Sequence, residues 1–148
     1  MLKQTLKTLF LRDLEKVKKE IEQYRQEQNI WKTAEGIANS GGNLCLHLVG
    51  NLKTYIGAEL GKTGYIRQRD LEFSLKDIPR SELLAKISET IGVVGTTFDQ
   101  LTDEQLAAEY PAPVLEGKAT TEFFLVHLSM HLSYHLGQIN YHRRLLDK

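Results

Sequence analysis

The chain has 148 residues, and its 19 Lys and Arg residues equal its 19 Asp and Glu residues, so the formal net charge is zero. A chain of this length buries roughly 70% of the surface that its unfolded form would expose, which is enough for one domain with its own core. The neutral balance argues against a nucleic-acid partner, which would favour a basic surface. We expect residues 1–148 to form a single domain.

Cys45 is the only cysteine, so no disulfide can form within the chain, as is typical of the reducing cytosol. The first 16 residues carry charges every few positions and lack the apolar core of a signal peptide. Residues 123–141 contain no Asp, Glu, Lys or Arg, over nearly the length of a membrane-spanning helix. Their three histidines and other polar residues favour instead a helix buried on most sides of a soluble bundle. We therefore expect a cytoplasmic protein with no membrane partner.

The first half of the chain predicts two long helices. The first spans roughly residues 2–26, where apolar residues recur at helical spacing and charges occupy the other face. The second follows Ser40, a suitable N-cap, with Asn43 in the position of a capping-box partner. It is expected to end near Gly61 and Gly64.

The second half predicts two more long helices. One begins near Pro79 and continues to about residue 101, and a short helical turn follows at residues 102–105. A loop then contains Pro111 and Pro113, and the last helix runs from about residue 120 to residue 146. Nothing in the chain alternates with the period of a β-strand, so we expect an all-α fold, a four-helix bundle. The connection at residues 61–78 is long enough for a crossover or a functional loop.

The histidines are the most informative residues. His131 and His135 are four apart on one predicted helix, so their side chains share a face, and His47 lies in an apolar stretch of another helix. Three protein ligands leave one position open in catalytic zinc sites. His127 continues the four-residue spacing but lies about 80° around the helix from His135, too far for one ion to use all three. Hydrogen-bonded core histidines remain the alternative to a metal site.

Two better-known metal chemistries are excluded by neighbouring residues. Leu128 and Leu132 stand where a zinc hydrolase of the HExxH kind places its glutamate base. Paired ExxH motifs, which di-iron bundles require, do not occur.

Asn43 and Asn51 flank His47 by one helical turn, and either they contact the metal ligands or they merely satisfy backbone and water. Ser129, Ser133 and Gly137 form a strip of small residues that fits either tight packing inside the bundle or a helix pair across a homodimer. The charged residues of the long connection fit either structural ion pairs or the binding of an anionic substrate: Arg67, Arg69, Asp70 and Glu72.

The sequence resembles the DinB-like (DNA-damage-inducible) family of four-helix-bundle metalloenzymes. The resemblance rests on NSGGNLCLHLVGNLKTYIGAELGKTGYIRQRDLEF at residues 39–73 and HLSMHLSYHLGQINYHRRLL at residues 127–146, and it extends over nearly the whole chain. It implies an up-down-down-up bundle with a long crossover between the second and third helices. It also implies a divalent metal, nickel or zinc, bound by His47, His131 and His135, with His127 beside the site, and frequent homodimers.

Some members of that family are thiol-dependent transferases or isomerases that use a low-molecular-weight thiol, and the resemblance implies such chemistry as one option. We expect a metal-dependent enzyme, a transferase or a hydrolase, that acts on a small molecule. A bound divalent ion lowers the pKa of a coordinated water or thiol and makes it a nucleophile. The alternative is a non-catalytic metal-binding or stress-response protein, whose metal would have a closed set of four ligands.

Overall fold

The computed structural model describes residues 1–148 and is all-helical, apart from two isolated β-bridges. The all-α prediction is therefore confirmed. The α-helices are α1 (Leu2–Gln23), α2 (Gly41–Leu52), α3 (Arg69–Ser74), α4 (Arg80–Gln100), α5 (Asp103–Ala107) and α6 (Thr121–Leu146). A 3₁₀-helix, η1 (Glu27–Trp31), follows α1, and a π-helical segment, η2 (Lys53–Ala58), continues α2.

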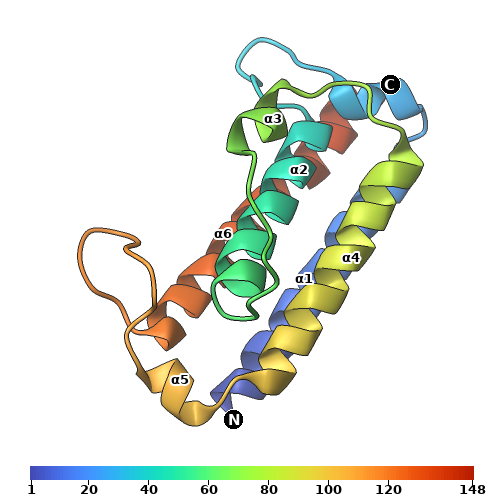
Figure 1. The fold of residues 1–148 in the computed structure, drawn as a ribbon. Helices are drawn as coiled ribbons and strands as arrows, with labels where there is room; N and C mark the ends of the chain where they lie inside the picture. Colours follow the sequence, from blue (N-terminus) through green and yellow to red (C-terminus); the bar gives the residue numbers. More distant parts are fainter.

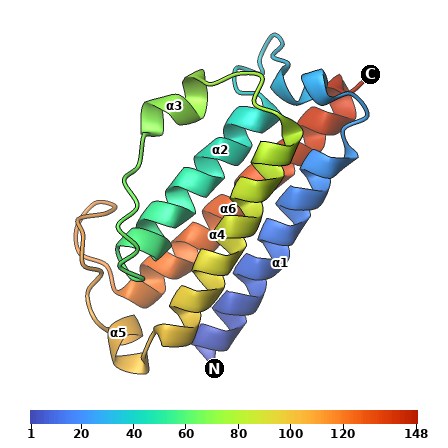
Figure 2. The same ribbon diagram turned by 45° about the vertical axis from the view of Figure 1, so that its right-hand side comes forward.

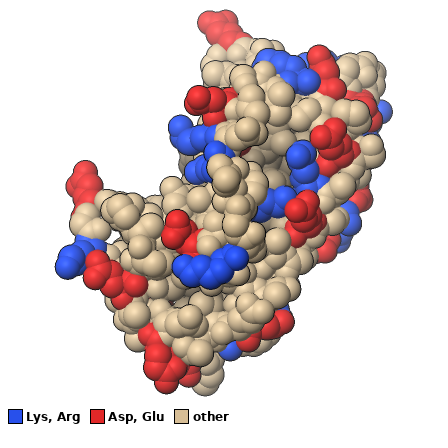
Figure 3. All heavy atoms as spheres, viewed as in Figure 1, with Lys and Arg blue, Asp and Glu red and all other residues tan.

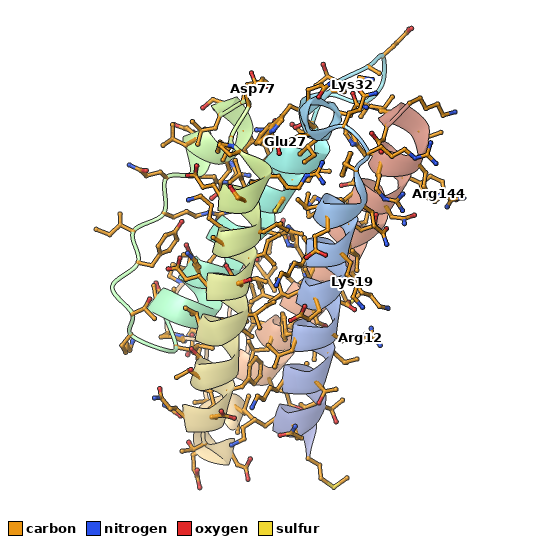
Figure 4. All side chains as sticks on the ribbon, turned by 90° about the vertical axis from the view of Figure 1, so that its right-hand side faces the viewer. Arg12, Lys19, Glu27, Lys32, Asp77 and Arg144 are labelled. Carbon is orange, nitrogen blue, oxygen red and sulfur yellow. The ribbon has the colours of Figure 1, made fainter.

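The long helices pack side by side around one hydrophobic core. Both α1 and α2 pack against α4 and α6, and α3 packs against α2 from the outside (Figures 1 and 2). The buried side of α1 supplies residues such as Phe10, whose ring lies 5.5 Å from that of Phe98 on α4. Arg12 and Lys19 point outward from α1, away from α4 (Figure 4). This division into a core side and a charged side is the one that the helical spacing predicts.

The end of α1 comes earlier than predicted because a distant carboxylate binds the turn that follows. Asp147 accepts hydrogen bonds from the backbone N–H of Arg25 at 2.6 Å and of Gln26 at 3.3 Å, and from Asn29 Nδ2 at 2.8 Å. These donors lie in or just before η1, where the chain turns away from α1. The C-terminus of the chain thus fixes the connection between α1 and α2.

Every residue of α2 is buried, and its start follows the prediction in part. Ser40 is the N-cap, and its Oγ accepts from Asn43 N–H at 3.1 Å. The Asn43 side chain does not return to the N-cap backbone as in a capping box; it accepts from Ser40 Oγ and donates to the carbonyls of Glu72 and Leu75. Asn43 therefore joins α2 to α3.

The burial of α6 differs from the prediction. We expected this uncharged helix to be buried on most sides, but one long face is exposed, with Phe123 at 61%, Met130 at 66% and Tyr134 at 65%. Ser133 and Gly137 are also exposed, and a Cβ added at Gly137 would meet nothing within 4 Å. Tight packing inside the bundle is therefore wrong for Ser133 and Gly137, whereas Ser129 is partly buried.

Charges of both signs are scattered over the surface, and neither sign forms a large single patch on the face shown in Figure 3. None of the helices is both long enough and apolar enough to cross a membrane.

Candidate metal centre

Three histidines from two helices come together beneath α3. His47 lies in the middle of α2 and is buried, whereas His131 and His135 lie one turn apart on α6 and are partly exposed. One ring nitrogen of each lies within 4.8 Å of the others. The Nε2 atoms of His47 and His131 are 3.2 Å apart. Two nitrogens bound tetrahedrally to zinc at about 2.0–2.1 Å lie about 3.3–3.4 Å apart, so this pair has the spacing of a zinc-bound pair.

His47 is oriented by a carboxylate from α3. Glu72 Oε1 lies 3.1 Å from His47 Nδ1, and Glu72 is buried. Arg67 binds both oxygens of the same carboxylate, at 2.8 Å from Nε and 3.0 Å from an Nη. Burial alone would raise the pKa of Glu72, but the hydrogen bonds from His47 and Arg67 outweigh it and lower that pKa. The carboxylate is thus ionised, and with Nδ1 of His47 donating to it, Nε2 has a free lone pair for a metal.

Space for Glu72 exists only because α2 carries a glycine on the same face as His47. A Cβ at Gly50 would overlap Oε2 of Glu72 and lie 2.6 Å from its Cδ. Residues three apart on a helix share a face, so Gly50 opens the surface of α2 directly beside His47. The carboxylate fills that opening.

The two histidines of α6 are held in the neutral form that metal ligation requires. Burial, followed by the neighbouring His135 and His47, lowers the pKa of His131 to about 4. Burial is also the main cause of the lowered pKa of His135, against a hydrogen bond to Gln138 that raises it. Gln138 Oε1 lies 2.7 Å from His135 Nδ1. An amide oxygen only accepts, so Nδ1 donates and Nε2 of His135 is left unprotonated.

The other predicted site residues lie around the cluster but are not part of it. Asn43 does not contact the histidines; it donates a hydrogen bond to the backbone carbonyl of Glu72, which in turn contacts His47. Asn51 is buried and forms no hydrogen bond through its Oδ1. His127 is exposed and stacks on Phe124, with 5.9 Å between ring centroids. His131 is the only cluster member within one helical turn of His127.

In the structure, the charged residues of the connection at residues 61–78 contact the histidine cluster or lie exposed. Arg67 and Glu72 pair with each other in the ion pair described above. Arg69 and Asp70 are exposed, and the Arg69 guanidinium lies over the ring of Phe73. Structural ion pairing was one of the two interpretations of this segment, and Arg67 and Glu72 follow it.

A cavity of about 350 Å³ adjoins the cluster on the side of η2 and the loop after α5. In Figure 3 the outline of the molecule is indented between that loop and α3. The cavity shares His131 with the cluster, and its lining residues are Asn51, Tyr55, Pro113, Val114, Leu115, Phe124, His127, Leu128 and His131. A small molecule in this cavity would therefore touch one of the three clustered histidines.

The sequence does not reveal the roles of two residues beside His47, namely Glu72, which orients the imidazole, and Gly50, which makes room for Glu72. Glu72 belongs to a charged connection, and nothing in its spacing relates it to a histidine 25 residues earlier. Gly50 gave a weak signal, since a glycine within an apolar helix costs up to about 1 kcal/mol and usually has a packing reason.

No curated protein matches the chain. The family model that matches the chain is not described as DinB-like, so the resemblance to that family stays a prediction. A family model described as "Protein of unknown function (DUF1572)" matches residues 2–148, nearly the whole chain, and the chain belongs to that family.

Proposed function

We propose that His47, His131 and His135 bind one divalent metal ion, zinc or nickel, and that the protein is a metal-dependent enzyme acting on a small molecule. The observation that carries this proposal is the convergence of the three imidazoles, with the Nδ1 atoms of His47 and His135 paired with acceptors so that Nε2 is free for the metal. Histidines paired in this way are typical of metal ligands.

When bound, such an ion supplies Lewis acidity that lowers the pKa of a coordinated water or thiol. The protein contributes the rest of the chemistry. His47 is fixed by Glu72 and Arg67 in a buried position, which sets the direction of its Nε2. Partial exposure of His131 and His135 leaves one side of the cluster open to a small molecule. Three protein ligands with an open side are the arrangement of catalytic rather than structural zinc sites.

Transfer of a low-molecular-weight thiol to an electrophile is the most concrete form of this proposal. The thiol loses its proton to solvent, a sulfur–carbon bond forms, and the leaving group departs with its electron pair. A hydrolase, in which water takes the place of the thiol, is the related option. The DinB-like resemblance supports the thiol version, and the absence of a glutamate after His127 and His131 disfavours a hydrolase of the HExxH kind.

The rival proposal is a non-catalytic metal-binding or stress-response protein with a closed site. Its natural fourth ligand would be His127, but this residue is exposed and stacked on Phe124. The partly open cluster and the adjoining cavity favour the enzyme.

We infer further that the four long helices form an up-down-down-up bundle in which the segment between η2 and α4 is the crossover. The pairing of α1 and α2 with both α4 and α6 supports this arrangement, as does the length of that segment. The single-domain expectation is supported by the shared core, to which α1, α2, α4 and α6 all contribute.

Elemental analysis of purified protein tests the metal proposal. We expect about one zinc or nickel ion per chain, and its loss in His47→Ala, His131→Ala and His135→Ala. His142→Ala is the matched control, because His142 lies on α6 but binds Tyr24 and the Lys32 carbonyl instead. Full metal content in both His47→Ala and His135→Ala would refute the site. Loaded protein is then screened with thiols and electrophiles, and turnover that depends on the metal distinguishes the enzyme from its rival.

A further inference from the structure

The crossover between η2 and α4 is held on one face of α2. Asn43, His47 and Gly50 follow one another at intervals of four and three residues, so they lie on the same face of that helix. Asn43 donates to the carbonyls of Glu72 and Leu75, at 3.0 and 2.8 Å. His47 contacts the Glu72 carboxylate, for which Gly50 leaves the space. One of the residues that hold α3 on α2 is therefore a candidate metal ligand.

Few other contacts fix the position of α3. It has only six residues, too few for a helix that is stable without packing. Every hydrogen bond that joins residues 64–75 to the bundle goes to Asn43 or His47. Phe73 adds a packing contact with the same histidine, with 5.1 Å between ring centroids. A change at His47 is therefore felt directly by α3.

The contact between His47 and Glu72 depends on which nitrogen of the imidazole carries the proton. Glu72 Oε1 lies 3.1 Å from Nδ1 and, as a carboxylate oxygen, only accepts, so the contact is favourable when the proton is on Nδ1. With the proton on Nε2, the lone pair of Nδ1 faces the carboxylate. Arg67 Nη2 lies 3.4 Å from Nδ1 and already binds Glu72, so it offsets this repulsion only in part.

His131 offers the proton of His47 a second place. The Nε2 atoms of the two residues lie 3.2 Å apart, so one donates to the other when no ion is bound between them. His47 is then either the donor, with its proton on Nε2, or the acceptor, with its proton on Nδ1. A metal bound through Nε2 removes the first arrangement, because a ligating nitrogen carries no proton. The proton is left on Nδ1, where it donates to Glu72.

We propose that metal binding at the histidine cluster stabilises the docking of the crossover on α2, because it fixes the proton of His47 on the nitrogen that faces Glu72. The proposal rests on the metal-dependent function proposed above and names a regulation of the same site. Linkage is reciprocal, so the metal strengthens the docking of α3 by the same factor as docking strengthens metal binding. Carboxylates that orient a ligating histidine change metal affinity by about 10–100-fold, which sets the size of the expected coupling.

Limited trypsin digestion of the full chain, with and without saturating zinc, tests the proposal. Arg67 and Arg69 are trypsin sites in the docked part of the crossover, and cleavage there requires local opening of the segment. Lys118, exposed in the loop before α6, is the internal control for the protease. We expect zinc to slow cleavage after Arg67 and Arg69 by about tenfold or more and to leave cleavage after Lys118 unchanged. No slowing at Arg67 and Arg69, or equal slowing at all three sites, would overturn the proposal.

Two variants trace the protection to the proton of His47. In Glu72→Gln the amide can either accept from Nδ1 or donate to it, so docking no longer depends on the position of the proton, and zinc that saturates the variant should give little protection. His135→Ala keeps the contact between His47 and Glu72 but removes a ligand, so the zinc concentration that protects the wild type should no longer protect. Asp70→Asn, on the exposed side of α3, is the matched control and should be protected like the wild type. Full protection of Glu72→Gln would contradict the proposed route.

The zinc content of each sample separates this proposal from the proposed function. Zinc uptake that depends on the three histidines, without slower cleavage after Arg67 and Arg69, contradicts the coupling alone. A protein that takes up neither zinc nor nickel contradicts the metal-dependent function and the coupling together.

Discussion

The carboxylate of Glu72 lies 3.1 Å from Nδ1 of His47, across 25 residues of sequence, and Arg67 holds the same carboxylate from its other side. This contact makes α3 part of the candidate metal centre, although α3 supplies no ligand. It also means that the ionised carboxylate, rather than water, determines which nitrogen of His47 carries the proton.

Glu72→Gln should weaken zinc binding by about 10–100-fold, because the neutral amide is a poorer acceptor for His47 and leaves Arg67 without its ion-pair partner. The measurement is competition for zinc against a chromophoric chelator. Asp70→Asn is the control, since Asp70 lies on α3 but is exposed and should leave the affinity unchanged. Equal zinc affinity in Glu72→Gln and the wild type would show that Glu72 does not act on the site.

Gly50→Ala tests the same contact from the side of α2. The added methyl group overlaps the Glu72 carboxylate, so either Glu72 moves off His47 or α3 lifts from α2. We expect a loss of about 1–3 kcal/mol in the free energy of unfolding and a zinc affinity as low as that of Glu72→Gln. Gly92→Ala is the control, because Gly92 lies in α4 with nothing within 4 Å of an added Cβ. Unchanged stability in Gly50→Ala would contradict the close packing of Glu72.

His127→Ala separates a neighbour of the metal from a ligand. His127 stacks on Phe124 and lines the cavity next to His131, so its loss should weaken metal binding by no more than about 10–100-fold. Elemental analysis and chelator competition are compared with those of His131→Ala. Loss of metal as complete as in His131→Ala would make His127 a ligand and the assignment wrong.

The site residues that follow helical spacing, His131 and His135, could be predicted from the sequence. The contribution of Glu72, which lies in the crossover, could not. The four-residue spacing of His131 and His135 places them on one face of any helix. Ser40 as N-cap and the limits of α6 follow equally from local signals. Glu72 lies on a six-residue helix within an irregular segment, and only tertiary packing brings it to His47. The π-helical turn of η2 likewise has no signal in the spacing of its apolar residues.

The prediction that α6 is buried on most sides was wrong for a different reason. The 19 uncharged residues of this helix are a signal for apolar surroundings, which the core of the bundle or a second chain can provide. In the structure the core covers Phe124, Leu128 and Leu132, while the opposite face is open. An apolar pattern predicts that a helix face is buried, but it does not identify the molecule that buries it.

Asp147→Ala should loosen the junction between α1 and α2. It removes three hydrogen bonds to a carboxylate that is 9% exposed, and we expect a loss of about 1–3 kcal/mol in the free energy of unfolding. Chemical denaturation at pH 7 is the measurement. Asp99→Ala removes an exposed ion pair with Lys7 and is the control, with an expected loss of less than about 1 kcal/mol.

The same carboxylate predicts a pH dependence. Burial would raise the pKa of Asp147, but the bonds from Arg25, Asn29 and Gln26 outweigh it, so its pKa in the folded protein is lowered. The stabilisation is therefore present above the unfolded pKa of about 3.9 and is lost as the pH falls through the lower folded value. The difference in stability between the wild type and Asp147→Ala should be constant near neutral pH and shrink below about pH 4. A difference that grows on acidification would contradict this assignment.

We propose that the exposed face of α6 packs against the same face of a second copy to form a homodimer. Its large apolar residues recur at helical spacing along the whole helix: Phe123, Val126, Met130, Tyr134, Tyr141 and Leu145. The small Ser133 and Gly137 lie on the same exposed side and permit close approach of two helices. Contiguous apolar surface of this kind is rare on a monomer and usually marks an interface.

Sedimentation velocity of the wild type at high micromolar concentration should show a dimer. A monomer at that concentration would refute the proposed homodimer. Met130→Glu places a charge from each copy in the proposed interface and should shift the protein to monomer while its helical content is unchanged. Ile66→Glu is the matched control, because Ile66 is equally apolar and exposed but lies in the crossover. Ser133→Leu should overpack the interface by about 1–3 kcal/mol and shift the equilibrium in the same direction. If Met130→Glu and Ile66→Glu leave the dimer equally intact, the contact lies elsewhere on the molecule, and the apolar face of α6 needs another explanation.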